Sequence, residues 1–193
     1  MYRALTWLAL RQGTDTADGE ALGRLAESAD IRFHQSTAGE AQRVYCRGRD
    51  VTEDIRSRPV SIAVPGVSAF ADVRKAIVEI QRKLAADQDV VMEGRDIGTV
   101  VLPDAECKIY LTATVEERAK RRLKERVGPG DLSGEAGQTL EDIILELKKR
   151  DLEDSTRKIS PLRRAEGSVL LDTTSLSFQE AVEEALRIVR SIQ

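Results

Sequence analysis

Residues 90–101, which read VVMEGRDIGTVV, join an apolar run to groups that could bind an anion. Arg95 and Asp96 stand side by side after that run, between Gly94 and Gly98. A guanidinium offers a planar fork of N–H donors that suits a phosphate, and the carboxylate can accept from an amino group or a hydroxyl. Because ligands bind at the carboxyl ends of strands in open α/β sheets, the pattern predicts a ligand site. A local Arg–Asp pair on the surface is the alternative.

Two further charged sets lie in the second half of the chain. Arg150, Asp154 and Arg157 are spaced i, i+4, i+7, which places them on one face of a helix if the helix continues through all three. The other set consists of arginines only: Arg118, Arg121 and Arg122. Solvated helix faces are the alternative for both sets. Arginines on both sides of a flexible loop suit phosphoryl transfer, because charge spreads onto the transferring oxygens.

The segment between these two sets, residues 127–138, is rich in glycine and reads VGPGDLSGEAGQ. It is interpreted as a mobile lid or as an ordinary connector. His34 is the only histidine and has no nucleophile motif nearby, so a structural role is expected. No HExxH, CxxC or EF-hand pattern occurs in the sequence, which predicts no protein-built metal site.

The composition of the 193-residue chain indicates a globular protein with a real core, because 41% of its residues are hydrophobic. The low aromatic content of 4% and the net charge of −3 argue against a nucleic-acid-binding protein. The two cysteines have no metal-ligand spacing, which predicts a reduced, intracellular protein. No apolar stretch reaches the roughly 20 residues of a membrane span, and the run ALTWLAL is too short for a signal peptide. We therefore expect a cytoplasmic protein with no membrane partner.

Periodicity predicts an α/β fold. Three apolar runs are predicted to form buried parallel strands: residues 90–93, 108–112 and 168–172. Apolar stripes with helical spacing predict three helices, over residues 73–84, 140–147 and 178–192. Capping boxes begin two of them, Thr139 with Asp142 and Ser177 with Glu180, and Thr114 with Glu117 begins a fourth helix. Residues 31–59 alternate loosely and predict a small antiparallel hairpin region.

Together these segments resemble bacterial cytidylate kinases (CMP kinases), a family of nucleoside monophosphate kinases, along essentially the whole chain. The matching segments are MYRALTWLAL, DVTEDIRSRPV, EGRDIGTVVLPDAECKIYLTA, ERAKRR and KKRDLEDSTRKISPL, and the third is the most specific. The resemblance implies a three-layer parallel sheet of the P-loop nucleoside monophosphate kinase type. It also implies a core kinase domain of residues 1–30 and 90–193 with a lid at about 127–138, and a β-containing CMP-binding insert of residues 31–89.

The implied reaction is transfer of the γ-phosphoryl group of ATP to CMP or dCMP, with Mg²⁺ bridging the phosphates. By resemblance, three arginines would hold the acceptor phosphate, with Tyr2 packed alongside: Arg3, Arg95 and Arg157. Asp96 and Arg74 would read the base, since a carboxylate is a natural acceptor for the amino group of cytosine. Two residues would address the sugar, Arg150 and Asp154. Three would border the ATP phosphates: Arg118, Arg121 and Arg122. The catalytic residues would be Arg95, Arg157 and Arg122.

The sequence departs from the family pattern at two places. Pro65 stands where the family commonly has a base-contacting serine, so selectivity for cytosine would depend more on Arg74 and Asp96. The chain opens at the Tyr-Arg helix, and the GxxxxGK[ST] phosphate-binding motif of the family occurs nowhere in it. A shortened chain, or a start assigned at an internal methionine, is the simplest explanation. We therefore expect little or no kinase activity from this chain by itself.

Three alternatives remain beside a cytidylate kinase, which we expect to act as a monomer on small-molecule substrates. The first is a kinase for UMP, another pyrimidine monophosphate, or for AMP. The second is a non-catalytic nucleotide-binding remnant, which the missing motif favours. The third is a nucleic-acid binder, against which the acidic balance and the scarce aromatics argue.

Overall fold

A computed structural model describes residues 1–34, 42–126 and 139–192. These residues form two compact units: an N-terminal unit of 1–34 and 42–89, and a C-terminal unit of 90–126 and 139–192. Residues 1–30 pack with elements of 31–89 in the N-terminal unit. The predicted core domain of 1–30 with 90–193, and the insert of 31–89, stay predictions. The predicted lid lies outside the described residues.

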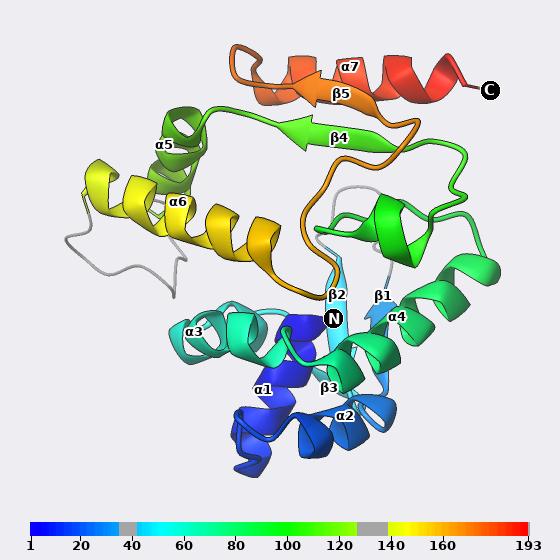
Figure 1. The fold of residues 1–193 in the computed structure, drawn as a ribbon, viewed down its shortest axis with the longest axis vertical. Helices are drawn as coiled ribbons and strands as arrows, with labels where there is room; N and C mark the ends of the chain where they lie inside the picture. The colour runs from blue at the N-terminus through cyan, green and yellow to red at the C-terminus, as the bar shows by residue number, and fades with distance from the viewer. Residues whose placement is uncertain (35–41, 127–138, 193) are drawn as a thin grey trace. The chain divides into compact units, whose positions relative to one another are not determined.

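The N-terminal unit combines four helices with three short strands (Figure 1). Its elements are α1 (Tyr2–Gln12), α2 (Gly19–Glu27), β1 (Ile31–His34), β2 (Arg43–Cys46), β3 (Arg49–Asp50), the 3₁₀ turn η1 (Asp54–Arg56), α3 (Arg58–Val67) and α4 (Ala71–Ala86). The strands are antiparallel in the order β1-β2-β3. Arg47 and Gly48 both have positive φ, 49° and 75°, as a tight hairpin turn requires. The predicted hairpin region is therefore confirmed.

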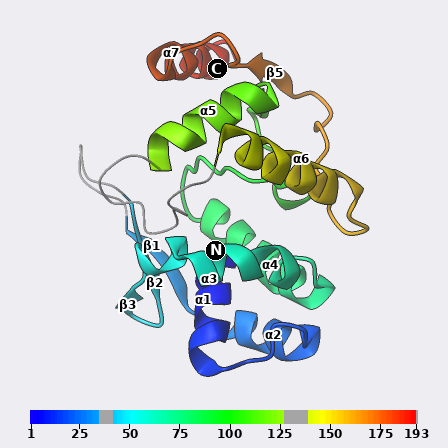
Figure 2. The ribbon, with the colours of Figure 1, turned by 90° about the vertical axis from the view of Figure 1, so that its left-hand side faces the viewer.

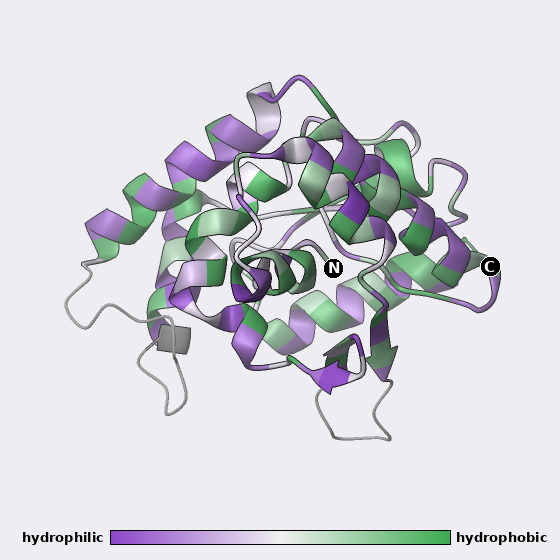
Figure 3. Cartoon of the chain, turned by 90° about the horizontal axis from the view of Figure 1, so that it is seen from below, coloured by the Kyte–Doolittle hydropathy of each residue, from purple (hydrophilic) through white to green (hydrophobic). Residues whose placement is uncertain are grey.

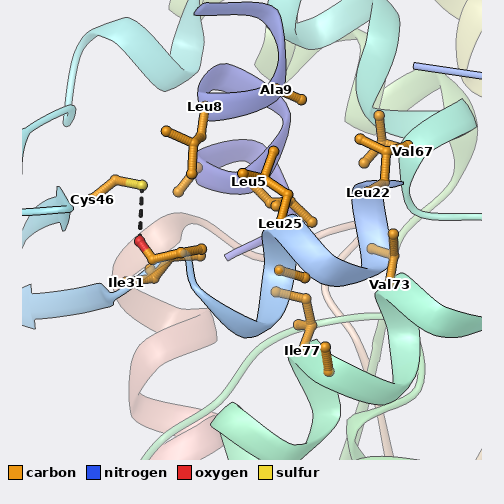
Figure 4. Close-up of a cluster of buried hydrophobic side chains, with 14 of the residues drawn as sticks. Leu5, Leu8, Ala9, Leu22, Leu25, Ile31, Cys46, Val67, Val73 and Ile77 are labelled. Carbon is orange, nitrogen blue, oxygen red and sulfur yellow. Dashed lines mark hydrogen bonds between the residues drawn. The ribbon is translucent and has the colours of Figure 1, made fainter. Parts of the chain in front are cut away.

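The core of the N-terminal unit holds α1 against α2, α4 and β2 (Figure 4). Leu5, Leu22 and Ile77 are completely buried in it. The thiol of Cys46 donates to the carbonyl oxygen of Ala29 at 3.3 Å, and burial raises its pKa. Each fully buried Leu or Ile contributes roughly 1.5–3 kcal/mol relative to an exposed side chain. This packing fixes α1, whose first turn carries two of the predicted site residues.

Helix α2 was not predicted from the sequence, because its two glycines lower helix propensity. The helix begins at Asp18, whose carboxylate accepts from the N–H of Ala21 at 3.0 Å. It also packs closely on α4: a Cβ atom on Gly23 would lie 2.7 Å from the Cβ of Asp72. The glycine that argues against a helix is thus the residue that lets two helices approach.

The C-terminal unit contains two parallel strands and three α-helices, together with a π-helical turn (Figure 1). Its elements are η2 (Ile97–Val101), β4 (Ile109–Thr112), α5 (Val115–Arg126), α6 (Leu140–Thr156), β5 (Val169–Asp172) and α7 (Phe178–Arg190). Strands β4 and β5 pair from Ile109 with Val169 to Thr112 with Asp172. Helices α5 and α6 lie side by side around a small buried cluster of Ala119, Ile143 and Leu147 (Figure 2). The two predicted parallel strands and the predicted helices of this part are confirmed, but the strands are not buried as expected. Leu111 of β4 is 65% exposed, and Leu171 is the only buried residue of β5.

The predicted strand at residues 90–93 is wrong. This segment is irregular, and Val91 is fully exposed. A strand needs a neighbour that accepts and donates its backbone hydrogen bonds. Among the described residues none pairs with 90–93, and β4 and β5 pair only with each other. The fold is therefore mixed α/β with a parallel strand pair.

The helices are amphipathic, and Figure 3 shows hydrophilic and hydrophobic residues alternating along their ribbons. Within the described ranges no helix has the length and apolar character needed to cross a membrane. His34 lies edge-on to the ring of Tyr45, with the ring centroids 6.0 Å apart. That contact fits the structural role expected for the only histidine.

Glu180→Gln is expected to lower the melting temperature of the C-terminal unit at pH 7 by about 1–3 °C. The Glu180 carboxylate accepts from the backbone N–H of Ser177 at 2.8 Å and so caps α7. Hydrogen bonds from the backbone and the side chain of Ser177 hold the pKa of Glu180 below its ordinary 4.5. A carboxyl with a lowered pKa stabilises the fold above its unfolded-state pKa and loses that effect as pH falls through its folded-state pKa.

The difference in melting temperature between the parent chain and the Gln variant should therefore shrink once the pH falls below the ordinary pKa of 4.5, and vanish when the Glu180 carboxyl is protonated in the folded chain too. Thermal unfolding in a series of buffers from neutral to acid pH measures this difference. A gap that stays constant down to the lowest pH would contradict the assignment of Glu180 as a charged cap.

Candidate functional site

The C-terminal unit brings three predicted site residues together. The Nε of Arg95 donates to Asp154 Oδ2 at 2.8 Å, and these two residues are 59 positions apart in the chain. Arg157 Nη1 lies 3.6 Å from the other carboxylate oxygen of Asp154. One carboxylate thus stands between two guanidinium groups that come from different segments.

The backbone around Arg95 is fixed by a tight turn that follows it. The carbonyl oxygen of Asp96 accepts from the N–H groups of Val100 and Val101 at 2.9 and 3.2 Å. Gly98 packs closely in the same turn, because a Cβ atom there would lie 3.1 Å from the Cβ of Ala165. Gly98 therefore allows the close approach of residue 165, and the bonds to the Asp96 carbonyl hold the turn that follows Arg95.

Helix α6 carries Arg150 and Asp154 one turn apart, but it ends before the third predicted residue. The sequence predicted Arg150, Asp154 and Arg157 on one helix face if the helix continued. The helix ends at Thr156, and Arg157 is its C-cap with extended backbone angles. Arg157 Nε donates to the carbonyl oxygen of Ser160 at 2.5 Å, while Nη1 of the same guanidinium faces Asp154.

The electrostatics of this cluster favour an anion. Two guanidinium groups and one carboxylate carry a formal charge of +1. The side chains of Asp154 and Arg157 are only 19% and 17% exposed, whereas that of Arg95 is 41% exposed. Half-buried charges are screened less than fully exposed ones, and guanidinium groups can bind phosphate oxygens in pairs. The carboxylate of Asp96, next to Arg95, belongs to a residue that is only 6% exposed.

A second group of predicted residues lies in the N-terminal unit. The guanidinium of Arg74 lies over the ring of Tyr2, with Cζ 5.4 Å from the ring centroid. Arg74 is nearly buried, and its Nη1 donates to the carbonyl oxygen of Ser68 at 3.2 Å. Arg3 Nη1 donates to the carbonyl oxygen of Ile55 at 2.8 Å. The structure thus places Tyr2, Arg3 and Arg74 on helices that the core of this unit holds in place.

The arginines of α5 contact protein groups in the C-terminal unit. Arg118 donates to both carboxylate oxygens of Asp151 on α6, at 3.1 and 2.6 Å, and these bonds raise its pKa. Arg121 donates to Glu117 on its own helix. It also donates to the hydroxyl and the carbonyl oxygen of Thr173, at 3.0 and 2.5 Å. Arg122 is half-buried on the same helix. These bonds join α5 to α6 and to the segment after β5.

Sequence reasoning did not identify the hydrogen-bond partners of Arg118, Arg121 and Arg3. Asp151 stands next to the predicted Arg150, but nothing in its spacing distinguished it from the other charges of α6. Ser61, whose Oγ accepts from Arg3 Nη1 at 3.0 Å, carries no motif. Thr173 follows a predicted strand, and its position at the carboxyl end of that strand was the only available signal.

Comparisons with known proteins decide the family. A family model described as cytidylate kinase matches residues 1–191. The chain belongs to the cytidylate kinase family. The cytidylate kinase of Carboxydothermus hydrogenoformans is 46% identical over 189 residues, which cover 98% of this chain and 82% of that protein. The cytidylate kinase of Bacillus subtilis strain 168 is 45% identical over 190 residues, covering 98% of this chain and 81% of its own length.

Membership in the cytidylate kinase family confirms the identification made from sequence motifs, and with it a phosphotransferase enzyme. The cytidylate kinase of Bacillus licheniformis, 47% identical over 189 residues, supports the same conclusion. No comparison assigns roles to single residues, so the roles of the two clusters stay proposals.

Proposed function

We propose that the protein transfers the γ-phosphoryl group of ATP to CMP or dCMP, giving ADP and CDP or dCDP. The cluster of Arg95, Asp154 and Arg157 supports this proposal most directly. By resemblance to the family, its residues belong to segments that bind the acceptor nucleotide. Its net positive charge suits the phosphate of a nucleoside monophosphate.

In the proposed reaction, an oxygen of the CMP phosphate attacks the γ-phosphorus of ATP in line with the leaving ADP oxygen. Arg95, Arg157 and Arg3 hold the attacking phosphate, while Arg122 stabilises charge on the transferred group. Little covalent chemistry falls to the protein, since positioning and charge stabilisation supply most of the catalysis in phosphoryl transfer. Arg95, Arg157 and Arg122 are the proposed catalytic residues.

Recognition of the nucleoside is assigned to four residues: Asp96, Arg74, Arg150 and Asp154. Asp96 accepts from the exocyclic amino group of cytosine, and Arg74 contributes to the same recognition from its stacked position on Tyr2. Arg150 and Asp154 bind the sugar. Asp154 then has two successive partners: the arginines in the free protein, and a sugar hydroxyl in the complex.

The donor side of the proposed site lies around α5. Three arginines would border the ATP phosphates: Arg118, Arg121 and Arg122. The bonds of Arg118 to Asp151 and of Arg121 to Thr173 keep α5 in place. The fold proposed for this arrangement is the three-layer sheet of the P-loop nucleoside monophosphate kinases, acting as a cytoplasmic monomer.

Magnesium enters the proposal as the partner of ATP. The described residues contain no group of three or more His, Cys, Asp or Glu side chains that could hold a metal ion. Mg²⁺ commonly keeps several waters and is bound by substrate phosphates with one or two carboxylates. The proposed roles of the arginines do not depend on where the ion lies.

Formation of ADP from ATP that depends on CMP or dCMP is the direct measurement of the proposed reaction. No CMP-dependent or dCMP-dependent ADP formation by a folded chain that binds CMP would contradict the proposed transfer.

CMP is expected to raise the melting temperature of the chain, and AMP and UMP at equal concentration to raise it much less. A ligand that binds only the folded state stabilises it by about 2.7 kcal/mol at 100 times its Kd. Differential scanning fluorimetry over a range of nucleotide concentrations measures the effect. Equal shifts for CMP and UMP would favour a kinase for another pyrimidine monophosphate. A cooperative transition without any shift would contradict the assigned acceptor site.

A further inference from the structure

The hydrogen bond between Arg3 and Ser61 has no role in the function proposed above. Arg3 lies in the first turn of α1, and its Nη1 donates to two acceptors: the carbonyl oxygen of Ile55 at 2.8 Å and Ser61 Oγ at 3.0 Å. These acceptors are 52 and 58 positions away in the sequence. They belong to η1 and α3, which pack directly on α1.

Two acceptors on one guanidinium nitrogen fix the direction of a long side chain. An arginine side chain loses rotamer entropy when it is immobilised. Where protein groups already hold the guanidinium, a ligand that binds to it pays less of that cost. The buried residues Leu5 and Val60 anchor α1 and α3 next to this contact, so the acceptors themselves are held by packed elements.

We propose that Ser61 is a positioning residue for the acceptor phosphate, acting through Arg3. This inference rests on the proposed function, in which Arg3 binds the phosphate of CMP. The carbonyl oxygen of Ile55 remains in any side-chain variant, so Ser61 is the acceptor that mutation can remove. Its hydroxyl keeps the guanidinium aligned for phosphate and has no part in binding the base or the sugar.

Ser61→Ala is therefore expected to weaken CMP binding by about 2- to 10-fold, because the Arg3 side chain is less ordered in the variant and loses more rotamer entropy when the phosphate binds. Cytidine, which lacks the phosphate, should bind the variant as it binds the parent chain. Ser61→Thr keeps a hydroxyl at the same position and should restore most of the CMP affinity. Ser57→Ala is the matched control: Ser57 precedes α3 and makes no side-chain capping bond.

The experiment compares the Kd values of CMP and cytidine for the parent chain, Ser61→Ala, Ser61→Thr, Ser57→Ala and Arg3→Ala by titration calorimetry. The inference is supported if Ser61→Ala lowers the CMP-to-cytidine preference and Ser61→Thr does not. Equal losses for CMP and cytidine would show a merely structural role and overturn it. If Arg3→Ala lowers the preference and Ser61→Ala leaves it unchanged, only the role of Ser61 fails. If Arg3→Ala has no effect, or the parent chain does not bind CMP, the proposed phosphate site fails and the inference with it.

Discussion

Replacement of Arg95 by alanine is expected to weaken CMP binding by about 10- to 100-fold, because each charge-assisted hydrogen bond to a phosphate contributes ~1.5–3 kcal/mol. The substitution also changes the charge of the cluster that remains. Without Arg95, Asp154 and Arg157 form a neutral pair, and the formal charge falls from +1 to zero. In that pair the negative charge of Asp154 offsets the positive charge of Arg157, so Arg157 attracts the phosphate less strongly.

Arg95→Lys separates charge from geometry at the same position. Lysine keeps the positive charge but lacks the planar fork, so its CMP affinity should lie between those of the parent and the alanine variant. Arg187→Ala is the control, since Arg187 is exposed and pairs with Glu184 on α7. Titration calorimetry with CMP measures all four chains. Parental affinity in Arg95→Ala, with an unchanged melting temperature, would remove Arg95 from the phosphate site.

The helices were predictable because their signals are local. The capping boxes at Thr139 and Ser177 and the apolar stripe of α7 need no partner elsewhere in the chain, and the structure contains all three features. The strand predicted at 90–93 failed for the opposite reason. Its apolar residues suit a buried strand, but a strand exists only with a hydrogen-bonded neighbour, and sequence periodicity does not supply one.

The candidate site shows the same division between local and long-range information. Residue type identified Arg95, Asp154 and Arg157, and family motifs suggested their roles. Spacing could not show that the Asp154 carboxylate lies between the two arginines, because that contact joins segments 59 positions apart. Nor could it show that Arg118 pairs with Asp151 on another helix. Partners across elements depend on packing that only the folded chain defines.

The largest change in base preference is expected from Asp96→Asn. Cytosine presents an amino donor at the position where uracil presents an oxygen acceptor, and a carboxylate can only accept. The asparagine amide can donate to that oxygen, so binding of CMP should fall while binding of UMP rises. One such contact discriminates between bases by about 1–3 kcal/mol. The ratio of the CMP and UMP affinities should therefore shift about 5- to 150-fold toward UMP.

The ratio of the CMP affinity to the UMP affinity is the useful readout, because Asp96 is nearly buried and its substitution could reduce the amount of folded protein. Asparagine has nearly the same shape as aspartate, so the binding site itself should keep its geometry. A loss of folded protein would reduce the binding of both nucleotides equally and leave the ratio unchanged. Asp104→Asn is the control, since Asp104 is an exposed carboxylate in the same region of the chain. If the ratio stays at its parental value in Asp96→Asn, the cytosine amino group is recognised by another residue, and Arg74 becomes the first residue to test.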